Sequence, residues 1–485
     1  MNKNQHEWEP VIGLEIHTQL NTKTKLFSRA PNRFGDEPNT NISAVCTGQP
    51  GSLPILNREA VKKAVQLGCA LGSSIALVSY FDRKSYFYPD NPRNFQITQF
   101  ETPILSGGEV RIEVDGEIKT IQLDRAHLED DTGMLKHFSN FAGIDYNRAG
   151  SALIEIVSTS CIRSAKEASA YAMAVRAILL YLDISDCNME EGSLRIDANI
   201  SVRIKGETIL RPKVEIKNMN SFHHMELALE SEIRRQTYAY ENGEEIGPGT
   251  YRFDLEKKAT VLMRKKEKAA DYRYFSEPDL PPIVLTPSFI EKIRAALPEL
   301  PEERYRRYLT QLNLPQDVAQ QLVADKPLSD YFEEALKHCS NPKNLCNWLI
   351  VEFSGRLKES GTTLVTLQIP PQHVASLINL IDSEKITGKI AKSVADAMLL
   401  SPGKDPALIV SENPDFVPIS TASIEPLVDQ VLSVNQESVR DYLAGKGRAF
   451  DFLVGQVMKL CKGKASPELV NKLLHDKIKA LGETP

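Results

Sequence analysis

The segment from Val11 to Leu20 alternates between apolar and polar side chains, and its polar positions include Glu15 and His17. A period of two is typical of a β-strand that buries one face. Side chains two residues apart on a strand lie on the same face, so this segment places a carboxylate beside an imidazole on a rigid element. Such a pair can begin a metal or proton-transfer site, and a half-exposed strand with a solvated polar face is the alternative.

Two later segments repeat this alternation. The first carries Arg195, Asp197 and Arg203 on its polar face, and the second carries Glu215 and Lys217. If the polar faces of all three strands converge, they line one cavity with carboxylates and basic groups. Carboxylate oxygens are the ligands that Mg²⁺ prefers, and Arg and Lys side chains bind phosphate oxygens. The pattern therefore indicates a site for a phosphorylated ligand and a hard metal ion.

A run of three acids that begins with Glu129 and Asp130 follows His127. We expect these carboxylates to join the same cavity, and a solvated loop is the alternative. The sequence contains no GxxxxGK[ST], GxGxxG, HExxH or GxSxG pattern. A site for ATP in this chain is therefore not a P-loop.

At 485 residues the chain exceeds the size that one hydrophobic core usually holds, so several domains are expected. We predict an α+β fold in which residues 1–293 form an N-terminal cradle with a mostly antiparallel or mixed β-sheet and helices. A proline cluster between Pro278 and Pro301 indicates the boundary of the cradle. Residues 294–405 are then predicted to form an all-α domain and residues 406–485 a small all-α tail. Strands are predicted at 10–20, 110–123, 150–158, 193–204 and 210–217, helices at 164–182 and 223–241, and irregular segments at 29–57, 84–103 and 124–149.

The charge distribution and the cysteines indicate which partners and which cellular compartment to expect. The net charge of −6 argues neither for nor against a nucleic-acid partner, but residues 441–480 hold eight Lys/Arg against four Asp/Glu. This local excess is typical of a phosphate- or RNA-facing end, and a solvated helical surface is the alternative. The seven cysteines are scattered without a CxxC pair, and neither an apolar signal core nor a run of about 18 apolar residues occurs. We therefore expect a protein of the cytoplasm with no membrane association.

Long stretches of the chain resemble one family. Residues 11–27, which read VIGLEIHTQLNTKTKLF, match its N-terminal signature, and the similarity recurs along the whole chain. Further matching segments are residues 81–90, 145–150, 190–195, 213–221, 271–275, 278–282, 388–392 and 452–459. These segments resemble the B subunit of the tRNA-dependent amidotransferase, a carbon–nitrogen ligase that converts Glu-tRNA(Gln) and Asp-tRNA(Asn) to Gln-tRNA(Gln) and Asn-tRNA(Asn).

The resemblance implies a function for the polar cavity. The cradle of this family carries an ATP- and Mg²⁺-dependent kinase site that phosphorylates the side-chain carboxylate of the mischarged amino acid, and ammonia then displaces the phosphate. The resemblance implies catalytic and metal-ligand roles for Glu15, His17, Glu129, Asp130, Asp197 and Glu215. We expect the ATP phosphates to contact Arg195, Arg203 and Lys217. Which of the two tRNA substrates is used in the cell stays open.

The resemblance also implies partners. Ammonia comes from a separate A subunit, an amidase-type glutaminase, and a small C subunit completes a heterotrimer, while the helical domain and tail hold tRNA(Gln) or tRNA(Asn). Many family members bind a structural zinc through four cysteines, but these positions read Ser28, Ala30, Ser43 and Cys46 here, so structural zinc is not expected. A non-catalytic RNA-binding scaffold and an unrelated ATP-dependent ligase for a free amino acid are the competing functions.

Overall fold

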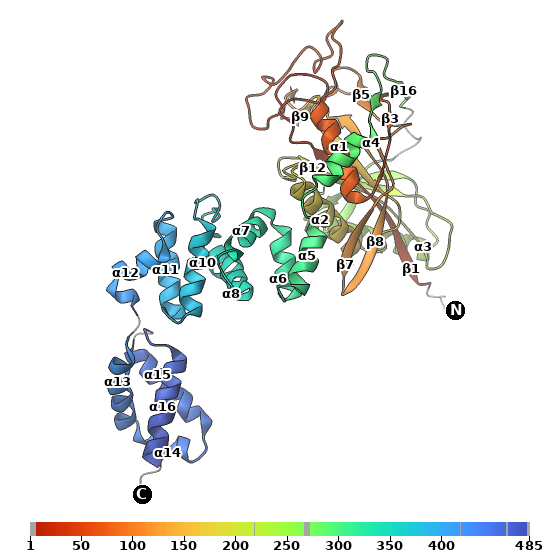
Figure 1. The fold of residues 1–485 in the computed structure, drawn as a ribbon. Helices are drawn as coiled ribbons and strands as arrows, with labels where there is room; N and C mark the ends of the chain where they lie inside the picture. The colour runs from red at the N-terminus through yellow and green to blue at the C-terminus, as the bar shows by residue number, and fades with distance from the viewer. Residues whose placement is uncertain (1–5, 218, 266–271, 418, 462–463, 483–485) are drawn as a thin grey trace, which may run out of the picture. The chain divides into compact units, whose positions relative to one another are not determined.

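The computed structural model describes residues 6–217, 219–265, 272–417, 419–461 and 464–482. The chain divides into two compact units, Met1–Glu303 and Arg304–Pro485. The first unit combines a sheet with helices and the second is helical, so the predicted α+β class is confirmed (Figure 1). A further division of the helical part after residue 405 stays a prediction. Asn218 and Asp271, which belong to two of the matching segments, lie outside the described residues.

A ten-stranded sheet forms the frame of the first unit (Figure 1). In chain order its strands are β1 (Trp8–Gln19), β2 (Ser74–Ile75), β6 (Leu105–Ser106), β7 (Glu109–Val114), β8 (Glu117–Asp130), β11 (Ala152–Ser158), β12 (Leu194–Ile204), β13 (Val214–Lys217), β14 (Gly249–Asp254) and β15 (Ala259–Lys265). The spatial order is β15-β14-β13-β12-β1-β11-β8-β6-β2, and β7 pairs with β8 off this path. Neighbouring strands run antiparallel except for β13 and β14, which run parallel.

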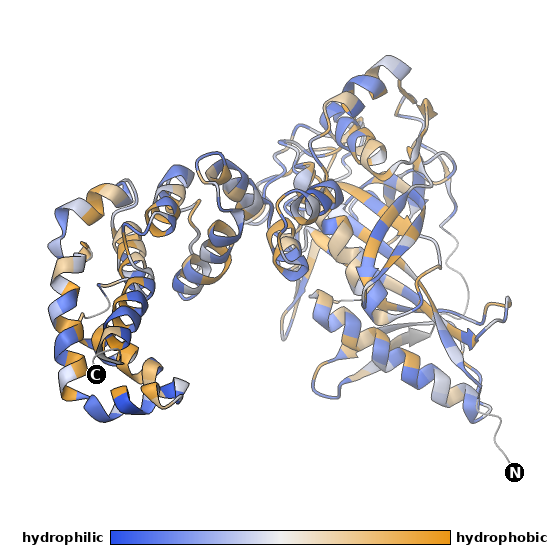
Figure 2. Ribbon diagram, turned by 60° about the horizontal axis from the view of Figure 1, so that its bottom comes forward, coloured by the Kyte–Doolittle hydropathy of each residue, from blue (hydrophilic) through white to orange (hydrophobic). Residues whose placement is uncertain are grey.

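One face of this sheet is apolar and forms the core of the unit. Ile12, Leu14 and Ile16 of β1 are at most 1% exposed, as their alternation predicts. They belong to one buried cluster with side chains of two helices, α2 (Ala165–Tyr181) and α3 (Phe222–Glu241). Figure 2 shows the alternation as hydrophilic and hydrophobic residues that follow one another along the strands. Because the two helices cover the apolar face, the opposite, polar face is left for a site.

The two helices confirm the helices predicted at 164–182 and 223–241. Each begins after a serine that caps it: Ser164 accepts a hydrogen bond from the backbone N–H of Glu167 at 3.1 Å, and Ser221 accepts one from that of His224 at 3.0 Å. These bonds satisfy donors that have no partner inside the helix, so the helices start where the sequence predicts.

Several of the predicted segments are wrong in detail, and the strand predicted at 210–217 is confined to β13. The single strand predicted at 110–123 is a hairpin of β7 and β8, because Asp115 and Gly116 both adopt positive φ, 53° and 81°, in the two-residue turn. The stretch predicted to be irregular at 124–149 contains the end of β8, then β9 (Met134–His137) and β10 (Ala142–Asp145). The apolar alternation of β8 changes phase at Asp124, where a bulge shifts its register against β11. A bulge inserts one extra residue, so β8 does not read as one period-two run.

A three-stranded sheet adjoins the polar face. Its strands are β5 (Phe95–Thr98), β4 (Asp82–Ser85) and β16 (Phe275–Ser276), with β4 in the middle. β4 and β5 interrupt the stretch 84–103, which the sequence predicts to be irregular. The remaining elements of the first unit are α1 (Arg58–Leu71), α4 (Pro287–Ala295) and a two-stranded ribbon of β3 (Val78–Ser79) and β17 (Ile283–Val284).

The second unit is built from helices, and α5 begins at the end of the first unit. The helices are α5 (Pro301–Thr310), α6 (Gln316–Ala324), α7 (Lys326–Leu336), α8 (Pro342–Asn347), α9 (Ser354–Leu357), α10 (Pro371–Asp382), α11 (Gly388–Leu400), α12 (Pro406–Glu412), α13 (Thr421–Val434), α14 (Gln436–Leu443), α15 (Gly447–Leu460) and α16 (Pro467–Gly482), with a π-helical stretch at Trp348–Phe353 and a 3₁₀ turn at Pro414–Phe416. Buried residues between Ile424 and Ile478 form a core of their own. None of the helices in the described ranges has the length and apolar character needed to cross a membrane.

Candidate active site

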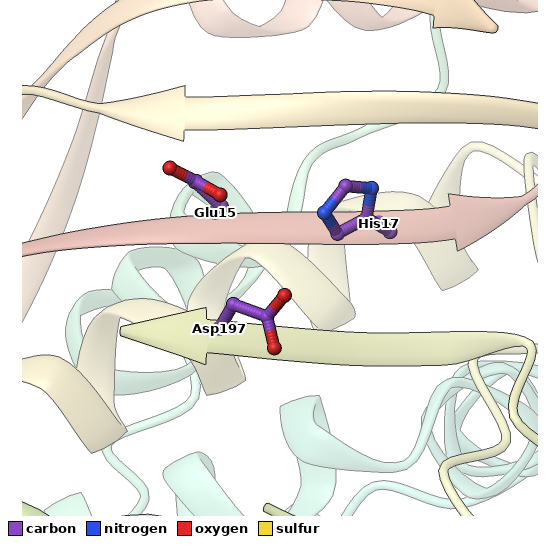
Figure 3. Close-up of side chains that lie close together, drawn as sticks. All are labelled: Glu15, His17 and Asp197. Atoms are coloured by element: carbon purple, nitrogen blue, oxygen red, sulfur yellow. The ribbon is translucent and has the colours of Figure 1, made fainter. Parts of the chain in front are cut away.

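The polar face of the central strands carries the predicted residues in rows across the sheet. Glu15 of β1 lies opposite Asp197 of β12, and His17 lies between Arg195 of β12 and Glu155 of β11. Residues directly opposite one another on antiparallel strands share a face, with Cβ atoms about 5 Å apart. Figure 3 shows Glu15, His17 and Asp197 on their two strands. Strand pairing therefore fixes the spacing of these side chains.

Two groups of potential ligand atoms meet at His17. The donor atoms of Glu15, His17 and Asp197 all lie within 4.8 Å of one another, and so do those of His17, Glu129 and Glu155. The shortest of these contacts that involves the imidazole joins His17 Nδ1 to Glu129 Oε1 at 3.4 Å. We call these five residues the acidic cluster. The cluster thus consists of two triads that share His17, and each triad offers two carboxylates and one imidazole, a set of ligands that suits a hard divalent cation.

Glu155 and His127 are site residues that the sequence prediction did not include. Glu155 pairs across the sheet with His17 on one side and with His127 on the other. The buried His127 places its Nε2 3.3 Å from Glu155 Oε2 and 3.7 Å from Glu129 Oε2. A signal for Glu155 is present in the sequence, because it stands between two buried isoleucines and so points to the polar side of its strand.

Neighbouring charges set the protonation of these groups. Burial, together with the charge of Glu155, raises the pKa of the Glu15 carboxyl. Burial alone would lower the pKa of both imidazoles, but the carboxylates outweigh it, so that the pKa of His17 is raised and that of His127 reaches about 9. The same contacts hold the pKa of Glu129 well below its usual range, against the effect of burial. His127 is therefore a buried cation that keeps neighbouring carboxylates ionised.

Lys217 borders the cluster from β13. Its ammonium donates a hydrogen bond to Asp197 Oδ2 at 2.6 Å and lies 2.9 Å from Glu215 Oε1. Burial opposes the charge of this lysine, but the two carboxylates raise its pKa overall. Asn199 donates a hydrogen bond to Glu15 Oε1 at 2.8 Å and thereby orients the carboxylate at the centre of the cluster. The predicted residues Glu215 and Lys217 thus pair with each other beside Asp197.

Lys84 brings a second cation from β4, and the sequence prediction did not include it. Its Nζ lies 5.0 Å from the centroid of the Tyr272 ring. Burial lowers the pKa of this lysine, but the charges of Glu129 and Glu155 raise it overall, so the ammonium stays charged. Lys84 stands on a four-residue strand that shows no apolar alternation, which is why its side of the strand is not readable from the sequence.

Asp130 lies next to Glu129 in the chain but has different partners. Its carboxylate forms an ion pair with Arg93 and accepts a hydrogen bond from the backbone N–H of Ile97 at 2.9 Å. Burial raises its pKa despite the guanidinium. Adjacent residues of a strand point to opposite sides, so the structure brings Glu129 to the cluster and turns Asp130 away from it.

The two arginines predicted to bind phosphate also have acidic partners. Arg195, in the same row as His17, donates a hydrogen bond to Asp131 Oδ2 at 2.7 Å. Arg203 donates one to Glu9 Oε1 at 2.6 Å. Because Arg203 follows Asp197 by six residues on an extended strand, it lies about 20 Å along β12 from the cluster. The structure therefore brings Arg195 to the edge of the site and leaves Arg203 outside it.

Comparison with known proteins identifies the family. A family model described as the GatB/GatE catalytic domain matches residues 10–291, and one described as the GatB domain matches residues 330–478. The chain is 64% identical over 479 residues to the B subunit of the aspartyl/glutamyl-tRNA(Asn/Gln) amidotransferase of Protochlamydia amoebophila, and the match covers 97% of each chain. The proteins of the same name from Chlamydia abortus and Chlamydia pneumoniae are 57% and 56% identical over 475 residues, which is 96% of this chain and 98% and 97% of theirs. The resemblance of the sequence segments is thereby confirmed, and the chain belongs to the family of the B subunits of the aspartyl/glutamyl-tRNA(Asn/Gln) amidotransferases.

Proposed function

We propose that this chain uses ATP to activate the side-chain carboxylate of Glu-tRNA(Gln), Asp-tRNA(Asn) or both, so that ammonia converts the carboxylate to an amide. The observation that carries the proposal is the acidic cluster on one rigid sheet face, bordered by Lys84 and Lys217. The relatives are named as aspartyl/glutamyl-tRNA(Asn/Gln) amidotransferase subunits, which supports amidation on tRNA.

A free carboxylate reacts poorly with ammonia because it has no good leaving group. In the proposed reaction a carboxylate oxygen attacks the γ-phosphorus of ATP, the bond from that phosphorus to the bridging oxygen breaks, and ADP leaves. Ammonia then attacks the acyl carbon, phosphate departs with the bonding electron pair, and the nitrogen loses a proton. The attacking carboxylate is already deprotonated, so His17 is needed here as a ligand or an orienting group and not as a base.

The donor set of the cluster fits Mg²⁺, and we propose that Glu15, His17, Glu129, Glu155 and Asp197 hold it. When bound, the ion supplies charge neutralisation at the transferring phosphoryl group. His17 must lose its proton to bind a metal ion, so binding is coupled to pH. Lys84 and Lys217 can each donate to a phosphate oxygen. We propose that Asp130 and Glu215, the other predicted ligands, position their neighbours instead, and that Arg195 contacts the ligand at the edge of the site.

We further propose the assembly in which the reaction occurs. An amidase-type glutaminase, the A subunit, supplies ammonia, and a C subunit completes a heterotrimer in the cytoplasm. The helical unit holds the tRNA by its shape and phosphates, which is consistent with the excess of Lys and Arg at residues 441–480. The subunit designation of the relatives supports the existence of other subunits.

The test measures ATP hydrolysis by this chain, purified with its A and C subunits, while ammonium, Mg²⁺ and Glu-tRNA(Gln) are supplied or omitted in turn. ADP formation that requires the mischarged tRNA and gives Gln-tRNA(Gln) supports the proposal. A heavy oxygen isotope placed in the glutamate side chain must then appear in the released phosphate. Tight tRNA binding without tRNA-dependent ADP would indicate a non-catalytic scaffold, and ADP formation with free glutamate alone would indicate an unrelated ligase.

A further inference from the structure

Arg83 makes a two-pronged ion pair on the side of β4 opposite to Lys84. Its Nε donates to Glu277 Oε2 at 2.7 Å and its Nη2 donates to Glu277 Oε1 at 2.9 Å. Nη2 also donates to Asp279 Oδ2 at 3.1 Å. The Glu277 side chain is 1% exposed, so the pair is largely shielded from water. The planar fork of Arg matches a carboxylate in a way that the single ammonium of Lys cannot.

Two aromatic rings complete this contact. Arg83 Cζ lies 4.3 Å from the ring centroid of Phe95 and 5.7 Å from that of Phe275. Phe95 belongs to β5 and Phe275 to β16, so one guanidinium contacts both strands that flank β4. β16 contributes two residues to the strand pairing. We call the ion pair of Arg83 and Glu277 the clamp. Because β16 is so short, its strand pairing alone is weak, and the clamp contributes substantially to the stability of the contact between β16 and β4.

The other side of β4 faces the acidic cluster. Thr98 of β5 donates a hydrogen bond to Glu129 Oε2 at 3.3 Å, and the ammonium of Lys84 interacts with the same carboxylate. The ring of Tyr272, which Lys84 contacts, belongs to the segment that leads into β16. The Tyr272 carbonyl accepts a hydrogen bond from the backbone N–H of Ser85 at 2.9 Å. The position of the Lys84 ammonium therefore depends on the segment from Tyr272 to β16, which the clamp holds against β4.

We infer that Arg83 is a positioning residue: through Glu277 it secures β16 and Tyr272 against β4, and so holds the Lys84 ammonium over the acidic cluster. The effect on turnover rests on the proposed function, whereas the effect on the position of Lys84 rests on the geometry alone. Arg83 lies behind the strand and does not face the cluster. Loosening the clamp displaces the ammonium without removing it, so we expect turnover to fall while binding of the tRNA is retained.

The test compares Arg83→Lys with the matched control Arg235→Lys in the complex with the A and C subunits. Arg235 makes the same two-pronged pair with the buried Glu232, at 2.9 and 2.6 Å, and its Cζ lies 4.6 Å from the centroid of the Tyr251 ring. It stands on α3, whose buried side chains pack on the apolar face of the sheet. Both substitutions keep the charge and remove the fork. A second clamp variant, Glu277→Gln, leaves Arg83 in place.

The first readout is the rate at which an amine-acylating reagent modifies Lys84, followed by peptide mass spectrometry. We expect this rate to rise severalfold in both clamp variants and to stay unchanged in Arg235→Lys. The second readout is tRNA-dependent ADP formation, for which we expect kcat to fall about 10- to 100-fold in the clamp variants with little change in the KM for the charged tRNA.

Several outcomes overturn the inference. One is unchanged modification of Lys84 in both clamp variants, and another is faster modification with unaltered kcat in an active complex. An equal loss of kcat in Arg235→Lys would show that the clamp acts only through general stability. If Lys84 is modified faster but the wild-type complex forms no tRNA-dependent ADP, the clamp is retained and the proposed function is rejected.

Discussion

The buried charge of His127 makes the stability of the first unit depend on pH in a defined window. Its Nε2 lies 3.3 Å from Glu155 and 3.7 Å from Glu129, and its side chain is 6% exposed. Burial lowers its pKa, but these carboxylates raise it from the ordinary 6.5 to about 9. A group whose pKa is raised on folding contributes stability that is fully present below the unfolded value and is lost as the pH rises through the folded value. The window therefore runs from about pH 6.5 to about pH 9.

The size of the effect follows from the same two values. The rise from 6.5 to about 9 corresponds to about 3 kcal/mol, at about 1.4 kcal/mol per pH unit. We expect the free energy of unfolding of the wild-type unit to fall by up to about 3 kcal/mol more than that of His127→Gln across this window. Glutamine keeps a hydrogen-bond donor for one carboxylate but does not titrate. His17 shares Glu129 and Glu155 with His127, so the difference between the two proteins reports the coupled titration of both imidazoles.

The assay is urea unfolding of the metal-free protein, followed by the fluorescence of Trp8 in a Trp348→Phe background, since these are the two tryptophans of the chain. His223→Gln, which removes an exposed imidazole from α3, is the control and should keep the wild-type slope. If His127→Gln shows the same loss of stability with pH as the wild type, His127 is not a buried imidazolium and the reasoning is refuted.

Three further predictions follow from individual contacts. Tyr171→Phe removes a buried hydroxyl that has no hydrogen-bond partner in the described chain, so its free energy of unfolding in urea should rise by about 1 kcal/mol. Tyr308→Phe removes a hydroxyl that lies 2.9 Å from Ser329 Oγ, so its free energy of unfolding should fall by about 1 kcal/mol. The opposite signs would contradict this prediction. Lys217→Met removes the cation beside Asp197, so isothermal titration should show tighter Mg²⁺ binding while tRNA-dependent ADP formation falls about 100-fold, and weaker Mg²⁺ binding would count against the cluster as the metal site. Asp130→Asn removes the charge of a buried carboxylate and leaves Arg93, whose side chain is 11% exposed, without its charge partner. Unfolding should therefore show a loss of about 2 kcal/mol with Mg²⁺ affinity nearly unchanged, and a large loss of affinity would restore Asp130 as a ligand.

The central part of the site could be predicted because it depends on the period of single strands. The alternation of apolar and polar residues within β1 and β12 places Glu15, His17 and Asp197 on the face opposite to the core, whatever the order of the strands. Pairing of the two strands then places Glu15 opposite Asp197. The same rule, applied to β11, identifies Glu155 as a polar-face residue. The periodicity of the sequence was therefore sufficient to predict which side chains face the site wherever a strand keeps one regular alternation along its length.

The rest depends on features that local periodicity does not contain. The bulge at Asp124 changes the phase of β8, so the sequence did not decide between Glu129 and Asp130 as the residue that faces the cluster. Lys84 and Arg83 stand on a short strand whose neighbours in its small sheet come from residues 95–98 and 275–276. Their roles follow from these long-range pairings, which no pattern within a single segment specifies.

The most direct measurement is tRNA-dependent ADP formation by the Glu15→Gln complex, compared with Glu9→Gln. Both glutamates lie on β1, but Glu9 pairs with Arg203 away from the cluster, whereas Glu15 lies opposite Asp197 within it. We predict that Glu15→Gln lowers kcat by at least about 100-fold while tRNA affinity is retained, and that Glu9→Gln keeps nearly wild-type turnover. Unchanged turnover in Glu15→Gln would contradict the assignment of the chemistry to this face of the sheet.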